Sequence, residues 1–111
     1  MLRSRRDFAR IQSAGRARSD RLMTVRYAPN QLGYDRFGIA TGRHLGGAVE
    51  RNRVRRRLRE LLRDAVRATP TGADILIIAR PAITEATFAE IREALGRLLR
   101  WVRSGPRAST P

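Results

Sequence analysis

The sequence predicts a single α+β domain, a small α/β sandwich in which helices pack on one sheet. A chain of 111 residues has the length of one domain with one modest core. Two stretches alternate between apolar and polar residues, as half-buried strands do, and a third is apolar throughout. Three other stretches show the three- and four-residue spacing of amphipathic helices. These patterns predict the order α-β-β-α-β-α.

The most informative stretch is residues 51–60, in which six of ten residues are arginine. Apolar residues recur through it at helical spacing, so we expect a helix over residues 48–68. Its apolar stripe comprises Val54, Leu58, Leu61, Leu62, Ala65 and Val66. Its opposite side comprises Asn52, Arg53, Arg56, Arg59, Arg63 and Arg67, with Arg55 and Arg57 on the flanks and Arg51 near the preceding loop.

So many arginines on one side of a helix repel one another. Each like-charge pair four residues apart costs about 0.2–0.5 kcal/mol in an isolated helix. A solvated surface would mix the two signs of charge more evenly, so the run favours a polyanionic partner. Arginine suits that role because its planar fork grips phosphate with two hydrogen bonds and stacks on bases.

Overall composition supports the same partner. The chain has 24 basic residues, all arginine, against ten acidic ones, and its net charge is +14. This balance points to nucleic acid. The absence of cysteine excludes disulfides and thiolate metal sites and fits a reducing cytoplasm. The longest apolar run, residues 75–79, is too short to cross a membrane, and no signal peptide opens the chain. We therefore expect a soluble cytoplasmic domain with no membrane partner.

The aromatic residue of the first predicted helix, Phe8, has two possible roles. Ser4 and Asp7 form its expected cap, and Ala14-Gly15 its end. Phe8 and Ile11 share one face. Phe8 is either a core plug or part of an aromatic platform beside a basic groove. The residues alone slightly favour the core.

The alternating stretches are residues 21–28 and 36–41, which we expect to pair as an antiparallel hairpin. Their inward residues would be Met23, Val25, Tyr27, Phe37, Ile39 and Thr41. Their outward residues would be Leu22, Thr24, Arg26, Gly38 and Ala40. The small residues Gly38 and Ala40 leave room for a ligand close to the backbone. One face of the hairpin would therefore be packed and the other open.

The remaining chain is predicted as follows. Residues 42–47 form a loop containing Arg43 and His44, and residues 74–79 form a central strand covered on both sides. Thr84 would cap a last helix. The core stripe of that helix would be Phe88, Ile91, Leu95, Leu98, Leu99 and Val102. Residues 104–111 would be a disordered basic tail beyond a domain of residues 1–103.

Enzyme chemistry is not visible in the sequence. There is no nucleophile beside a base, no close carboxylate pair and no cluster with metal-ligand spacing. The glycines before residue 48 are not followed by the G-K-[ST] of a phosphate loop. We expect no catalytic residue and no metal or cofactor bound by the protein itself.

Several motifs together resemble the bacterial ribonuclease P protein subunit. They are Arg36-Phe37-Gly38-Ile39, Arg43-His44-Leu45-Gly46, Ala48-Val49 and the run from Arg51-Asn52-Arg53 to Arg59-Glu60. The likeness covers about residues 2–102. It implies a mixed sheet of three to four strands, sometimes with one further short strand, and a left-handed crossover through the long helix. In that family a large RNA that uses magnesium ions is the catalyst, and the protein binds this RNA and the single-stranded 5′ leader of precursor tRNA.

The resemblance also implies two sites. The residues expected to bind the catalytic RNA are Arg43, His44, Arg51, Asn52, Arg53, Arg55, Arg56, Arg59 and Arg63. Those expected to bind the leader are Phe8, Ile11, Gln12, Thr24, Arg26, Gly38, Ala40 and Arg80. The family often has a second aromatic residue where this chain has Gln12, which weakens the stacking part of the leader site. No obligate protein partner is implied.

Three rival functions fit parts of the sequence. A general RNA-binding or ribosomal-type protein would suit the same basic helix and open sheet. A DNA-binding regulator is less favoured, because a helix that reads a groove usually carries more Asn, Gln or Ser than the single Asn52. A stand-alone nuclease is disfavoured by the missing acid and base.

Overall fold

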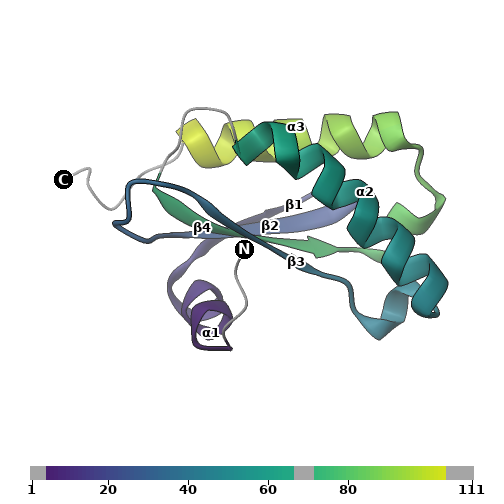
Figure 1. Cartoon of the computed structure of the whole chain (residues 1–111), viewed down its shortest axis with the longest axis horizontal. Helices are drawn as coiled ribbons and strands as arrows, with labels where there is room; N and C mark the ends of the chain where they lie inside the picture. The colour runs from purple at the N-terminus through teal and green to yellow at the C-terminus, as the bar shows by residue number, and fades with distance from the viewer. Residues whose placement is uncertain (1–4, 67–71, 105–111) are drawn as a thin grey trace.

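One four-stranded sheet organises the molecule, with helices on both faces (Figure 1). The computed structural model describes residues 5–66 and 72–104. The strands are β1 (Arg16–Ser19), β2 (Met23–Pro29), β3 (Arg36–Ala40) and β4 (Ala73–Ala79), in the spatial order β1-β2-β4-β3. The helices are α1 (Arg5–Ala14), α2 (Ala48–Val66) and α3 (Phe88–Ser104), and the short 3-10 helices are η1 (Arg43–Leu45) and η2 (Pro81–Glu85). The predicted α+β class is confirmed, with β1 as the further short strand.

The predicted hairpin between β2 and β3 is wrong. β4 lies between them, antiparallel to β2 and parallel to β3. Every residue of β4 is buried except half-buried Ile78. A strand that is apolar on both faces gains most from the centre of a sheet, where helices cover both sides. The chain therefore leaves β3, crosses through α2 and returns as β4, and the hand of this crossover stays a prediction.

The strand β1 forms because the chain turns sharply at both of its ends. At Gly15 a Cβ atom would overlap the carbonyl oxygens of Ile11 and Tyr27, so the turn out of α1 needs glycine. At the other end, the carboxylate of Asp20 accepts hydrogen bonds from the backbone N–H groups of Leu22 (2.8 Å) and Met23 (3.0 Å). The bend interrupts the alternation of residues 21–28. Leu22 is consequently buried in the main core, and its predicted outward position is wrong.

The main core lies between the sheet and the pair α2 and α3. The predicted inward residues Met23, Val25, Tyr27 and Phe37 are buried there, and Ile39 packs against them. From α2 the predicted stripe residues Val54, Leu58 and Leu62 are buried, with Leu61 and Ala65 at the margin. Periodicity therefore identified most of the packed residues of both element types, with Leu22 as the exception, and the side chain of Val66 lies outside the described residues.

The start of α3 differs from its prediction. Thr84 lies within η2, where its hydroxyl donates to the carbonyl of Pro81 (2.9 Å). The cap is Thr87, whose hydroxyl accepts from the N–H of Glu90 (3.1 Å) while the Glu90 carboxylate accepts from the N–H of Thr87 (2.8 Å). Hydrogen bonding of its carboxylate to the backbone and side chain of Thr87 lowers the pKa of Glu90. Phe88, predicted in the core, is only half-buried because it now begins the helix.

The other face of the sheet carries α1 as its only helix among the described elements (Figure 1). Ile11 is fully buried there against Ala28 and Leu76, with Ala40 and Ile78 packed at the margin. The expected Ser4 cap lies outside the described residues, as does the tail except for Ser104, which ends α3. α1 covers part of this face, and the rest is the predicted open surface.

Candidate nucleic-acid interface

The exposed face of α2 carries the central arginine motif. Val54, Leu58 and Leu62 point into the core, so residues about half a turn away point to solvent. The exposed residues of this face include Asn52, Arg53, Arg56, Arg59 and Arg63, and the acidic residues Glu60 and Asp64 are exposed as well. The first five belong to the set predicted to bind the catalytic RNA, and the helix brings them into one row. A row of guanidinium groups on a rigid helix can follow a phosphate backbone.

The flanking arginines of α2 are partly committed to the fold. Arg55 donates to the hydroxyl of Thr41 (2.6 Å) and to the side-chain carbonyl of Asn52 (3.1 Å), which links α2 to the end of β3. Arg57 donates to the carbonyl of Ala86 (3.4 Å). Arg51 is half-buried, and its buried Nε has no hydrogen-bond partner within the described part of the chain. Arg55 is therefore fixed near the start of the helix, and half-buried Arg51 lies one turn before it.

The 3-10 helix η1 places two further predicted residues at the start of α2. Arg43 and His44 are both exposed. The His44 Nε2 atom lies 3.3 Å from the carbonyl oxygen of Ala79, the last residue of β4. Arg80 follows directly and is held by a bond from its guanidinium to the carbonyl of Asp20 (2.9 Å). Residues predicted for two different sites, His44 and Arg80, thus meet at one end of β4.

Four residues predicted to bind the leader share the open face of the sheet. Thr24 and Ala40 flank Ile78 in one row across the strands, and Arg26 and Gly38 flank Leu76 in the next. The Thr24 hydroxyl is hydrogen-bonded to that of Ser19 (2.7 Å), which fixes it on the surface. Thr24, Arg26 and Ala40 are half-buried. Gly38 is buried and, having no side chain, keeps this part of the surface flat.

The three predicted leader residues of α1 have different positions. Gln12 is exposed, and its backbone carbonyl accepts a hydrogen bond from Arg26 (3.3 Å), which joins α1 to the open face. Ile11 is completely buried, and its predicted contact with the leader stays a prediction. Its side chain anchors α1 to the sheet. The side chain of Phe8 lies outside the described residues, and its role stays a prediction.

Sequence reasoning missed a buried carboxylate beside this face. Asp74 has no exposed surface and accepts hydrogen bonds from Arg36 (2.8 and 2.7 Å), from Asn30 (2.9 Å) and from Arg10. Burial by itself raises the pKa of Asp74, but the bonds from Arg36 and Asn30 and the two nearby positive charges outweigh it, so the pKa is lowered. An acid within an otherwise apolar strand was the available signal. The network ties α1 and the segment before β3 to β4.

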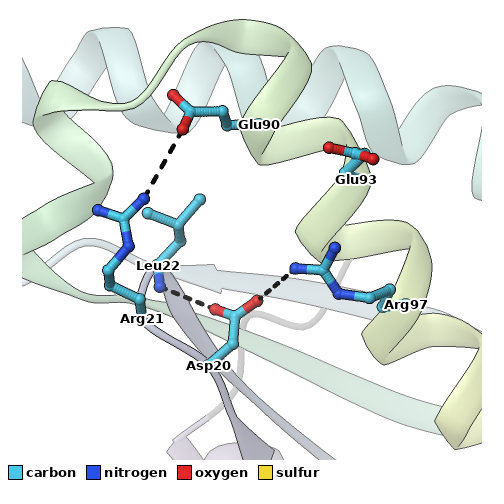
Figure 2. Close-up of a pocket in the computed structure, with 6 residues that line it drawn as sticks. All are labelled: Asp20, Arg21, Leu22, Glu90, Glu93 and Arg97. Carbon is cyan, nitrogen blue, oxygen red and sulfur yellow. Dashed lines mark hydrogen bonds and ion pairs between the residues drawn. The ribbon is translucent and has the colours of Figure 1, made fainter.

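A small cavity on the other side of the sheet has mixed charge (Figure 2). Arg21 pairs with Glu90 (3.7 Å) and Arg97 with Asp20 (3.6 Å), and Glu93 also lines the cavity. Three carboxylates against two guanidinium groups do not favour an anionic ligand. These pairs instead link the bend before β2 to α3.

The described residues show two further features relevant to function. They contain no group of three His, Cys, Asp or Glu side chains placed to hold a metal ion. None of their helices combines the length and hydrophobicity needed to span a bilayer.

Together, the α+β fold and the arginine row of α2 define a small basic domain of the RNA-binding class. The Ribonuclease P family model matches residues 1–103. The chain therefore belongs to the ribonuclease P protein family, whose members are components of a tRNA-processing endoribonuclease.

Individual relatives agree with this assignment. The ribonuclease P protein component of Chloroflexus aggregans is 41% identical over 100 residues, which are 89% of this chain and 74% of that protein. That of Herpetosiphon aurantiacus is 39% identical over 98 residues, 88% of this chain and 80% of the relative. Among solved structures, a Thermotoga maritima RNase P protein superposes with a TM-score of 0.84 at 34% identity and covers 96% of this chain and 100% of its own. A Staphylococcus aureus RNase P protein gives 0.84 at 28% identity, covering 92% and 94%.

Proposed function

We propose that this chain binds the catalytic RNA of ribonuclease P through α2 and η1, and the 5′ leader of precursor tRNA through the open sheet face. The observation that carries the proposal is the exposed row of Asn52, Arg53, Arg56, Arg59 and Arg63 on a helix whose other side is core. Membership of the family supplies the partner RNA. The leader would lie beside α1, across Thr24, Arg26 and Ala40.

The chemistry in this proposal belongs to the RNA. The protein supplies neither a catalytic residue nor a cofactor, and magnesium ions are used by the RNA subunit. Arginines of α2 would replace part of the cation atmosphere around crowded phosphates, so that less magnesium is needed for the RNA to fold and act. The expected product is tRNA with a mature 5′ end, formed in the cytoplasm.

Reconstitution tests this function directly. The full chain is added to a ribonuclease P RNA with precursor tRNA while magnesium is varied. We expect cleavage at the mature 5′ end to occur at lower magnesium with the protein than without it. An Arg53→Gln/Arg56→Gln variant should lose much of this effect, and Arg92→Gln, exposed on α3, should keep it.

Two outcomes would contradict the proposal. If the protein binds RNA well but never lowers the magnesium requirement, the chain is a general RNA-binding protein. If the protein cleaves precursor tRNA without any RNA subunit, the chemistry is its own. One S. aureus relative is described as a mutant with defective mRNA degradation activity. An mRNA fragment therefore belongs among the substrates tested with the protein alone.

A further inference from the structure

A second basic surface lies at the β1 edge of the sheet, away from both proposed sites. A shallow, open groove of about 570 Å³ lies between β1 and the C-terminal half of α3. Its lining residues are Arg18, Arg97, Arg100, Trp101, Arg103 and Ser104, and we call it the Trp101 pocket. No part of it was predicted from the sequence, because residue 18 and residues 97–104 are far apart in the chain.

The sheet order explains this convergence. Arg18 pairs with Val25, whose side chain lies in the main core, so Arg18 points to the face that α3 covers. α3 packs against β2, next to the β1 edge, whereas α2 packs against β3 at the other edge. The Trp101 pocket therefore lies on the β1 side of α3, whereas the arginine row lies on the exposed face of α2.

Trp101 provides a fixed aromatic surface. Its ring meets that of Tyr27 edge to face, with centroids 5.3 Å apart and planes at 83°. Tyr27 is buried, so this contact holds the indole in place. Trp101 is only half-buried and also lines the pocket. A rigid ring with one part against the core and another facing a groove can stack on a ligand at little entropic cost.

The arginines around the ring divide into two pairs. Arg97 is held by Asp20, and Arg103 donates to the carbonyl of Ala65 (3.2 Å). Arg18 and Arg100 are exposed and make no hydrogen bond or ion pair with other residues that the structure describes. Within residues 5–66 and 72–104, no carboxylate lines the pocket. The adjoining cavity of Figure 2, which shares Arg97, has three.

We propose that the Trp101 pocket binds a second segment of single-stranded RNA, with one base stacked on Trp101 and neighbouring phosphates on Arg18 and Arg100. Aromatic stacking beside a positive groove is how proteins hold single strands without reading their sequence. An acidic peptide would satisfy the arginines but leave the indole surface without a matching partner. The site is separate from the arginine row of α2 and from the open sheet face, and it does not depend on the proposed role in tRNA processing.

The protein carries its own reporter for this site, because Trp101 is its only tryptophan. A single-stranded oligouridylate of about ten nucleotides is titrated into the full chain while tryptophan fluorescence is recorded. We expect saturable quenching. Arg100→Gln should weaken it and lower the log–log salt slope by about 0.7, the value for a single strand that gives up one phosphate neutralised by the protein. Arg92→Gln is the matched control, since Arg92 is exposed on the same helix but does not line the pocket.

Two further variants separate this site from the others. Arg53→Gln/Arg56→Gln/Arg59→Gln should reduce total RNA binding but keep the quenching transition. Trp101→Leu, followed by the anisotropy of a labelled oligouridylate, should weaken the same transition about 5- to 150-fold if a base stacks there. A melting curve of this variant shows whether it is folded. Arg18→Gln/Arg100→Gln leaves the core untouched and gives an independent answer.

Three results would overturn the proposal. Quenching lost in the α2 variant but not in Arg100→Gln would mean that the indole only senses RNA bound elsewhere. Equal losses of quenching for Arg100→Gln and Arg92→Gln would show that binding depends only on overall positive charge. Polyglutamate that quenches as strongly as RNA at the same ionic strength would assign the pocket to acidic peptides. The reconstitution experiment is read out by cleavage, so its failure is distinguishable from any of these.

Discussion

At the scale of single residues, the carboxylate of Asp74 fixes the position of α1 relative to β4. Asp74 is the buried charged residue at the centre of the described chain's strongest polar network. Its two cationic partners, Arg10 and Arg36, keep 37% and 28% of their side-chain surface exposed. The network is therefore a partly solvent-exposed junction between α1 and β4. It positions the helix that borders the open sheet face, and its one carboxylate neutralises only one of the two arginine charges there.

Asp74→Asn should destabilise the fold. Removing one partner of a buried pair costs about 3–5 kcal/mol, and we expect the lower end because the arginines can regain water. Denaturant unfolding measures the change. Asp64→Asn, an exposed acid on α2, is the control and should have little effect. Equal stabilities of the two variants would show that the network contributes nothing.

The same residue predicts how stability depends on pH. The folded-state pKa of Asp74 is below its ordinary value of 3.8, so the unfolded chain binds the proton more tightly. The contribution of Asp74 is therefore complete above that value. It is lost as pH falls from about 3.8 through the lowered pKa. Acid titration of unfolding free energy should be steeper for the unchanged chain than for Asp74→Asn over this window, and identical slopes would refute the assignment.

Phe8 separates two roles for α1. If Phe8 stacks on a leader base, Phe8→Ala should cost about 1–3 kcal/mol of binding to precursor tRNA and nothing with mature tRNA. If Phe8 is a core plug, the change should lower stability by about 3–5 kcal/mol and weaken both ligands alike. Binding to the two tRNA forms, together with melting curves, decides. Phe8→Leu serves as the control that keeps apolar volume but removes the aromatic ring.

At the scale of elements, the two halves of α2 have opposite effects on the stability of the helix. Its inner half is ordinary core packing through Val54, Leu58 and Leu62. In its outer half, arginines one turn apart, such as Arg59 and Arg63, repel one another and destabilise the helix. Packing holds the helix together in spite of that repulsion, so the arginines are already aligned before any phosphate arrives.

Arg53→Ala/Arg56→Ala tests what the outer half binds. Both side chains are exposed, so thermal stability should change little. If each arginine neutralises one phosphate of ribonuclease P RNA, the variant should lower the log–log salt slope of binding by about 1.4–1.8. Filter binding at several salt concentrations measures the slope. An unchanged slope with unchanged affinity would mean that this face is merely solvated.

At the scale of the whole molecule, repulsion among the positive charges destabilises the folded state. The chain has a net charge of +14, and the structure has a radius of gyration of 13.4 Å. At low salt, charges repel across this whole distance, whereas at 0.15 M the Debye length is only about 8 Å. The free protein and its RNA complex should therefore respond to salt in opposite directions.

We expect the melting temperature of the free protein to rise as sodium chloride increases from about 0.02 to 0.2 M, because screening relieves self-repulsion. RNA affinity should fall over the same range. A variant with Arg53, Arg56, Arg59 and Arg63 all changed to Gln should melt higher at low salt and depend less on salt. A melting temperature that falls with salt in both proteins would show that favourable ion pairs dominate instead.

Local pattern was enough to predict much of the fold and the exposed face of α2. Helical periodicity identified the inward Val54 and Leu58 and therefore the outward Arg53 and Arg56, since each follows from the repeat of one helix. Continuous apolarity identified β4 as central. The Thr87 cap was missed because Thr84 has the same residue type at an equally plausible distance. Leu22 was misplaced because a bend stabilised by Asp20 is invisible to a two-residue repeat.

By itself, the sequence determined the element types, their buried faces and the arginine row of α2, because each depends on residues within a few turns of one another. Only the tertiary structure decided which strands pair, that Ile11 is a buried anchor, and that Asp74 meets arginines 38 and 64 positions away. It also decided that Arg18 and Trp101 line one pocket. The physical reason is that pairing and packing are chosen by competition among distant partners for one core. That competition is settled by the fold of the whole chain rather than by any local repeat.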